Sequence, residues 1–334
     1  MILAFWISLI VAAIISKPTL MLLKAAKSRQ TISQHVPDGH QVKQGTPTMG
    51  GVIPVVGTLA ALGFAAGRSG TAESTRFYVG AILLLVGFAI IGFLDDYLVP
   101  RMIPGSRGLS WIPKLIMQFV VAGGVCIWAT KDFQIVTATI IILFFSNAYN
   151  FSDGLDGLAG GLLLAMLPGY VAFAGLAVAP PVAVVAGAMC GAIIPFLFLN
   201  APPARVFMGD FGSLPIGAVL GFLTAFLAGQ FSGGTVFPTV GIVGSPAPFF
   251  WTGVDTRSFL PLALLGFVMA AELIPVPIQI ASVKLFKRKV FPFTPIHHAF
   301  ERAGWKETRV VWSFILVQLL ATAAAYTVAY SAVK

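Results

Sequence analysis

Charged side chains are scarce in this sequence. Only 10% of its 334 residues are Asp, Glu, Lys or Arg, while 57% are hydrophobic and the mean hydropathy is +0.92. A typical soluble domain carries about 25% charged residues, so the composition excludes an ordinary soluble protein. Cysteine is scarce too. Cys126 and Cys190 both fall in apolar stretches, which favours packing over a disulfide framework or a metal site.

The apolar residues form long runs along the whole chain. A helix needs about 20 apolar residues to cross a bilayer, so we expect an all-α polytopic membrane protein with about ten transmembrane helices. We expect one integral membrane domain over residues 1–334, with no separate soluble domain. The expected spans are 1–23, 50–67, 77–94, 111–130, 133–150, 158–179, 182–199, 213–230, 259–283 and 309–330.

The ninth expected span contains helix-breaking residues. Pro275 and Pro277 interrupt it, and Glu272 comes just before them. Proline removes a backbone donor and kinks a helix, and broken membrane helices are tolerated mainly where they face protein or a water-filled cavity. We therefore expect the ninth helix to be broken.

Basic residues predict the orientation of the chain. Fifteen of the twenty-one Lys and Arg residues follow the odd-numbered spans. The positive-inside rule assigns these loops to the cytoplasm and both termini to the outside of the membrane. Five aspartates fall on the same side, which predicts a cytoplasmic active-site cleft: Asp95, Asp96, Asp153, Asp156 and Asp210.

The first acidic group is the adjacent pair Asp95 and Asp96, at the end of the third span. A carboxylate at membrane depth costs several kcal/mol unless it is paired, hydrated or bound to a cation. On a helix the two side chains diverge by about 100°. One carboxylate would then contact the reacting group, and the other would bind a metal or orient its neighbour. The alternative is that the pair is only a solvated helix end.

The second group repeats a polar residue at every third position: Asn147, Asn150, Asp153 and Asp156. On a helix such residues share a face, so we expect one polar stripe that suits a base, a sugar or a metal shell. A cap of the sixth span by Asp153 or Asp156 is the alternative, and it explains one residue of the four.

The third group is Asp210 in a glycine-flanked turn that opens the eighth span. Such a turn offers backbone N–H groups to anions, and an aspartate there is a typical ligand of Mg²⁺. A simple helix cap is again the alternative. Lys43 and Thr48 suit phosphate contact, and His297 and His298 would donate to a pyrophosphate unless they are only a surface pair.

Five segments together carry a resemblance to a known family. They are KQGTPTMGG (43–51), GFLDDY (92–97), NAYNFSDGLDGLAGG (147–161), ARVFMGDFGSL (204–214) and PIHHAFERAGW (295–305). In this order they resemble the phospho-N-acetylmuramoyl-pentapeptide transferases, members of the polyprenyl-phosphate N-acetylhexosamine-1-phosphate transferase superfamily, of glycosyltransferase 4 type. One departure is that Ala299 stands where the family has a third consecutive histidine.

The resemblance implies an enzyme that takes phospho-N-acetylmuramoyl-pentapeptide from its UDP derivative to undecaprenyl phosphate and releases UMP. It implies Mg²⁺ as the cofactor, with Asp210 as metal ligand and with Asp95 and Asp96 as the reacting pair. It also implies a nucleotide pocket and a histidine motif near the phosphates, formed by Lys43, Asn150, Asp153, Asp156, Phe207, His297 and His298.

The expected partners are these two substrates and the lipid bilayer; a homodimer is allowed, and no nucleic acid is expected. A polyprenyl-phosphate N-acetylglucosamine-1-phosphate transferase is the nearest alternative. A secondary transporter is the alternative from another class, because intramembrane acids and a broken helix suit transporters as well. A catalytically silent relative that only binds lipid precursors is a third.

Overall fold

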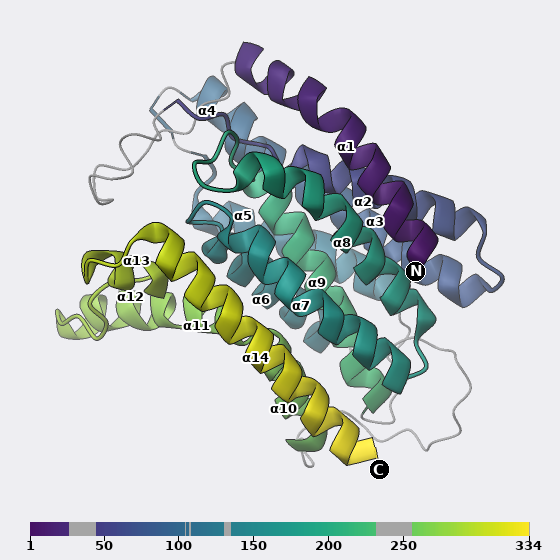
Figure 1. The fold of residues 1–334 in the computed structure, drawn as a ribbon. Helices are drawn as coiled ribbons and strands as arrows, with labels where there is room; N and C mark the ends of the chain where they lie inside the picture. Colours follow the sequence, from purple (N-terminus) through teal and green to yellow (C-terminus); the bar gives the residue numbers. More distant parts are fainter. Residues whose placement is uncertain (27–44, 104, 107, 130–134, 232–255, 334) are drawn as a thin grey trace.

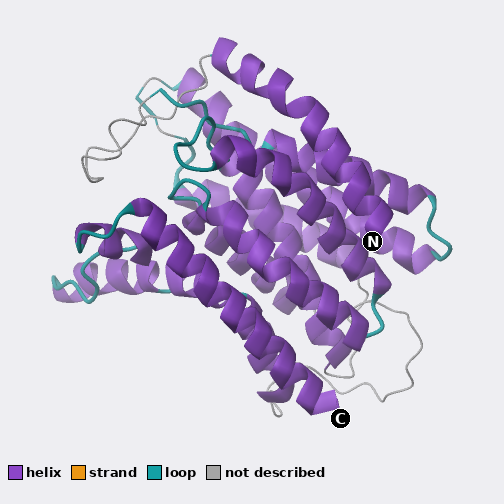
Figure 2. Cartoon of the chain, viewed as in Figure 1, coloured by secondary structure: helices purple, strands orange, loops and turns teal. Residues whose placement is uncertain are grey.

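A computed structural model of the chain describes residues 1–26, 45–103, 105–106, 108–129, 135–231 and 256–333. Within these ranges the chain forms helices and connecting loops and no strand, as Figure 2 shows. The expected all-α architecture is confirmed. It follows from the apolar composition, because a backbone that crosses lipid must satisfy its hydrogen bonds internally.

The helices follow the predicted spans closely (Figure 1). They are α1 (Ile2–Ala25), α2 (Val52–Gly67), α3 (Ala72–Phe93), η2 (Leu94–Leu98), α4 (Val99–Met102), α5 (Trp111–Ala129), α6 (Ile135–Ser152), α7 (Leu158–Leu176), α8 (Pro180–Asn200), α9 (Asp210–Phe231), α10 (Thr256–Leu265), α11 (Phe267–Leu273), α12 (Pro275–Phe286), α13 (Ile296–Arg302) and α14 (Glu307–Val333).

Nine stretches of the described chain are long and apolar enough to cross a membrane. The remaining expected span, 50–67, is the shorter apolar helix α2 of 16 residues. Both termini lie at one end of the bundle, and α4 and α13 lie at the opposite end (Figure 1). This arrangement fits an even number of crossings.

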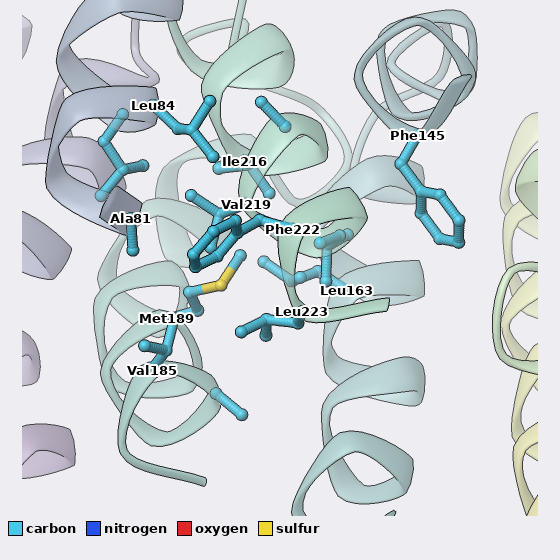
Figure 3. Close-up of a cluster of buried hydrophobic side chains, with 14 of the residues drawn as sticks. Ala81, Leu84, Phe145, Leu163, Val185, Met189, Ile216, Val219, Phe222 and Leu223 are labelled. Carbon is cyan, nitrogen blue, oxygen red and sulfur yellow. The ribbon is translucent and has the colours of Figure 1, made fainter. Parts of the chain in front are cut away.

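Helix α9 is the centre of the bundle. Its apolar window is 89% buried, compared with 17% for α1 at the edge. Glycines allow α9 to lie directly against α6, because a Cβ at Gly217 would come within 2.6 Å of the Phe145 carbonyl oxygen. Figure 3 shows the core on the other side of α9, where Val219 and Phe222 lie close to Leu84 of α3 and Met189 of α8.

The ninth span is broken, as predicted, but at two places. One break lies at Ile274, just before Pro275, and a second separates α10 from α11 at Gly266. Gln318 of α14 bonds the backbone at the second break. Its Nε2 donates to the Leu265 carbonyl (2.9 Å), and its Oε1 accepts from the Val268 N–H (3.1 Å). The proline pattern alone did not predict this second break.

Candidate active site

Three predicted acids converge where the end of α3 meets the start of α9. One carboxylate oxygen from each of Asp95, Asp96 and Asp210 lies within 4.8 Å of the others, and all three residues are half-buried. We call these three residues the acidic cluster. Hard divalent cations prefer oxygen ligands of this kind. The cluster is therefore a candidate metal site assembled from two helices far apart in sequence.

Glycines bring the two helices close enough to form the cluster. A Cβ on Gly92 of α3 would lie 2.4 Å from the carbonyl carbon of Asp210, so only a residue without a side chain allows this approach. Gly209 adopts φ +70°, a left-handed conformation that favours glycine. A Cβ there would lie 2.5 Å from Asp96 Oδ2 and 2.6 Å from Thr48 Oγ1. Thr48 is thus buried behind the turn that presents Asp210.

The segment around Thr48 pairs with the loop before α9. The Phe207 N–H donates to the Pro47 carbonyl (2.9 Å), and the Gly50 N–H donates back to the Phe207 carbonyl (2.7 Å). The two motifs at 43–51 and 204–214 therefore support one another through their backbones. Phe207 is half-buried beside this contact. Lys43, the expected phosphate contact in the same segment, lies outside the described residues.

Asp95 and Asp96 have different surroundings although they are adjacent. Asp95 Oδ1 accepts from the Leu109 N–H (2.8 Å), and its Oδ2 lies 3.4 Å from Lys114 Nζ. Asp96 Oδ2 accepts from the Phe211 N–H at the start of α9 (3.1 Å). Both residues lie in the π-helical turn η2, where an α-helix was expected. Such turns occur frequently at functional sites.

Lys114 is a candidate site residue that sequence reasoning missed, since it was counted only among the basic loop residues. It extends from the first turn of α5 and forms ion pairs with both Asp95 and Asp210. Gln118 follows one turn later on α5 and accepts from Asn147 Nδ2 (2.7 Å). The spacing of Lys114 and Gln118 marks one helix face and could have indicated a polar strip directed at the acids.

Only part of the expected polar stripe is helical. Helix α6 ends at Ser152, so Asn147 and Asn150 share its face while Asp153 and Asp156 belong to the turn before α7. Asn150 Nδ2 donates to Asp210 Oδ1 (2.7 Å) and to Ser213 Oγ (2.8 Å). The prediction of one continuous helical stripe was wrong because the glycines at 154 and 157 end the helix there.

The alternative that Asp153 or Asp156 caps the following helix is wrong. Helix α7 begins after Gly157, which has no side-chain cap, so neither aspartate caps it. Asp156 is buried, and its Oδ2 accepts from the Ala204 N–H (2.9 Å), which ties the turn to the loop before α9. Asp153 lies near the acidic cluster. Burial raises the pKa of its carboxyl well above the usual value, and the negative charges of Asp210 and Asp96 raise it further.

The two histidines lie beside this turn and next to each other, with ring centroids 4.2 Å apart. His297 is buried, and its Nδ1 lies 3.0 Å from Glu272 Oε2. His298 is half-buried, and its Nδ1 lies 2.8 Å from Glu301 Oε2. The alternative of a surface pair is therefore wrong for His297, which is buried. Glu272 is a second residue that the sequence did not assign to the site.

The site combines two kinds of group. The acids suit a cation, and the amides, the lysine and the histidines suit an anionic ligand that also carries polar groups. Comparison with known proteins agrees with this chemistry. Residues 78–228 match the model of glycosyl transferase family 4, and residues 43–53 match the first signature of phospho-N-acetylmuramoyl-pentapeptide-transferase.

Curated relatives match nearly the whole chain. Proteins named phospho-N-acetylmuramoyl-pentapeptide-transferase are 31% identical in Aliarcobacter butzleri, 33% in Heliobacterium modesticaldum and 33% in Thermobifida fusca. The alignments cover 95%, 96% and 97% of this chain and 90%, 95% and 96% of the respective relatives.

Proposed function

Because this chain belongs to the phospho-N-acetylmuramoyl-pentapeptide-transferase family, we propose that it transfers phospho-N-acetylmuramoyl-pentapeptide from UDP-N-acetylmuramoyl-pentapeptide to undecaprenyl phosphate. UMP leaves, and the product is the first lipid-linked precursor of peptidoglycan. The observation that carries this proposal is the convergence of Asp95, Asp96 and Asp210 beside Lys114. The whole chain acts as one membrane transferase domain.

The acidic cluster fits Mg²⁺ by the nature of its donors. Asp210 would be the main ligand, and Asp95 and Asp96 provide further carboxylate oxygens close by. When bound, Mg²⁺ supplies positive charge that offsets the repulsion between two phosphate groups. Asn150 orients Asp210 through its hydrogen bond to Oδ1.

Two routes of transfer fit these residues. In the first, an oxygen of the lipid phosphate attacks the β-phosphorus of the UDP-sugar, a new P–O bond forms, and the P–O bond to UMP breaks. Asp95 or Asp96 removes any proton left on the lipid phosphate. In the second, one of these carboxylates attacks the same phosphorus and releases UMP, and an oxygen of the lipid phosphate then displaces the carboxylate from the phospho-sugar. Lys114, which lies between Asp95 and Asp210, counters the charge on the phosphates in both routes.

Substrate contacts come from residues around the cluster. We assign nucleotide contacts to Asn150, Asp153 and Phe207, as the resemblance implies. Asn147 adds a further polar contact from the same face of α6, and the residue type of Lys43 suits phosphate contact. Thr48 and Asp156 are buried and support the turns that carry Asp210 and Asp153. The basic loops favour a cytoplasmic site with both termini outside the inner membrane. A homodimer stays a prediction, and the mass of the purified protein in detergent tests it.

The test is UMP release by the purified chain in detergent with UDP-N-acetylmuramoyl-pentapeptide, undecaprenyl phosphate and Mg²⁺. We expect release that requires both the lipid phosphate and the metal, together with formation of a lipid-linked sugar. Release from UDP-N-acetylglucosamine alone would identify the related hexosamine-1-phosphate transferase instead. Absence of UMP, together with movement of a solute across vesicles that contain the chain, would identify a transporter.

A further inference from the structure

A buried carboxylate and a buried imidazole meet beneath the candidate site. Glu272 belongs to the last turn of α11, directly before the break of the ninth span. His297 belongs to the first turn of α13, 25 residues later. Their side chains are 0% and 1% exposed. A buried charge of this kind is costly unless it is well paired, so the pair has a structural or functional reason.

Glu272 bonds His297 at two points. Its Oε1 accepts from the His297 backbone N–H (3.2 Å), and its Oε2 lies 3.0 Å from Nδ1. A carboxylate only accepts hydrogen bonds, so Nδ1 carries a hydrogen toward it. Because one contact fixes the backbone and the other the ring, the direction of the imidazole is determined by Glu272.

The other ring nitrogen has no such partner. His297 Nε2 is buried, and among the described residues no hydrogen-bond partner reaches it. It lies against Gly154, where an added Cβ would come within 2.5 Å of Nε2. Gly154 itself is exposed and follows Asp153. The nitrogen is thus directed at the turn that borders the acidic cluster.

We propose that Glu272 is a positioning residue that holds His297 so that Nε2 accepts a hydrogen bond from the UDP-sugar. With the hydrogen held on Nδ1, a neutral imidazole presents a lone pair at Nε2. A lone pair suits an N–H or O–H group of the nucleotide-sugar, and it does not suit the oxygens of a pyrophosphate. This inference rests on the proposed function and changes the role expected for His297 from phosphate donor to acceptor.

Two substitutions at His297 separate its two nitrogens. The amide of His297→Asn reaches Glu272 as Nδ1 does but has no group at the position of Nε2. The amide of His297→Gln reaches the Nε2 position but loses Glu272. For His297→Asn we expect a melting temperature close to that of the native chain and a KM for UDP-N-acetylmuramoyl-pentapeptide raised about tenfold, which corresponds to one lost hydrogen bond. The kcat should change less than the KM.

Glu272→Gln keeps the shape of the side chain and exchanges the hydrogen bonding. If its oxygen keeps the His297 N–H, its NH₂ faces Nδ1 and the ring hydrogen moves to Nε2. The KM should again rise about tenfold, and the double variant should be no worse than His297→Asn alone. Gly154→Ala should raise the KM as well, because the added Cβ would come within 2.5 Å of Nε2 and force the ring or the turn to shift.

The matched control is the second histidine–carboxylate pair on α13. Glu301→Gln makes the same change of carboxylate to amide at the partner of the half-buried His298. We expect a smaller rise in KM than for Glu272→Gln. The inference would be overturned if the effects of Glu272→Gln and His297→Asn on the KM were additive, or if His297→Asn had the native KM. UMP release by the native chain would still support the proposed function in that case. If the native chain neither binds nor consumes the UDP-sugar, both fall together.

Discussion

The acidic cluster brings three half-buried carboxylates together with one lysine, whereas the Glu272–His297 pair holds one carboxylate against one imidazole with almost no exposure. The acidic cluster has more negative than positive charge and is partly open to solvent. It can therefore exchange its counterion. The pair is closed to solvent and joined by two hydrogen-bonding contacts, so it fixes a geometry. The open cluster therefore suits the proposed cation chemistry, and the closed pair suits the proposed orientation of a binding group.

The strongest test of this contrast is to remove a charge from the open cluster. Asp210→Asn should lower the rate of UMP release by about 10²–10³-fold and raise the Mg²⁺ concentration needed for half-maximal rate. Steady-state rates over a Mg²⁺ titration measure both effects. Glu73→Gln, at an exposed acid in the first turn of α3, is the control. A near-normal rate at low Mg²⁺ would remove Asp210 from the metal site.

The second test asks whether adjacent acids in the open cluster are interchangeable. Asp95 is held by Leu109 and Lys114, and Asp96 is held by Phe211. Because their partners differ, we expect Asp95→Asn and Asp96→Asn to be unequal. One should lower kcat far more than it changes the KM for the UDP-sugar. Equal and mild losses at both positions would show that neither carboxylate reacts.

The third test separates the two helices that form the open cluster. Gly92→Ala would force α3 away from the start of α9, because the new methyl group would lie 2.4 Å from Asp210. A shift of about 1 Å at a reacting group can cost about 10²-fold in rate. We expect a loss of that order and a lower melting temperature. Gly124→Ala, in a helix with open space, is the control. Its activity should persist, and equal damage there would refute the close-approach argument.

The fourth test addresses the stability of the break before α11, the helix that carries Glu272. Gln318→Leu leaves the Leu265 carbonyl and the Val268 N–H without their side-chain partner. Each buried group left unpaired costs about 1–3 kcal/mol, so we expect a lower melting temperature. Thr327→Ala, at an exposed hydroxyl later on α14, is the control. An unchanged melting temperature in Gln318→Leu would mean that other groups satisfy the break.

The smallest expected effect comes from restoring the third histidine of the family motif. Ala299→His adds one donor to α13, next to two histidines that remain. A typical hydrogen bond contributes about 0.5–1.5 kcal/mol net, and His297 and His298 remain, so the native chain should be active and Ala299→His should increase its kcat/KM only a few-fold. Ala303→His, at the exposed end of α13, is the control. An inactive native chain that gains turnover only with Ala299→His would identify a silent relative.

The sequence predicted the helices well because apolar runs of bilayer length leave few alternatives to a helix. It also identified Asp95, Asp96 and Asp210, since acids at the ends of such runs are conspicuous. It missed Lys114 because a lysine at the start of a helix cannot be distinguished, from sequence alone, from a solvent-exposed basic residue of a cytoplasmic loop. It also missed the π-helical turn at Leu94–Leu98 and the end of α6 at Ser152. Both depend on how α3 and α6 meet α9, which residue spacing does not contain.

The hydrogen bonds of Gln318 have a consequence for how the protein is made. Where α10 gives way to α11, the backbone leaves polar groups that lipid cannot satisfy. The side chain that bonds them belongs to α14, about 50 residues later in synthesis. The ninth span therefore enters the membrane with an unfinished hydrogen-bond ladder, and the last helix completes it. Biogenesis of this region ends only when the final helix has been inserted, and a ribosome stalled before Gln318 would leave it incomplete.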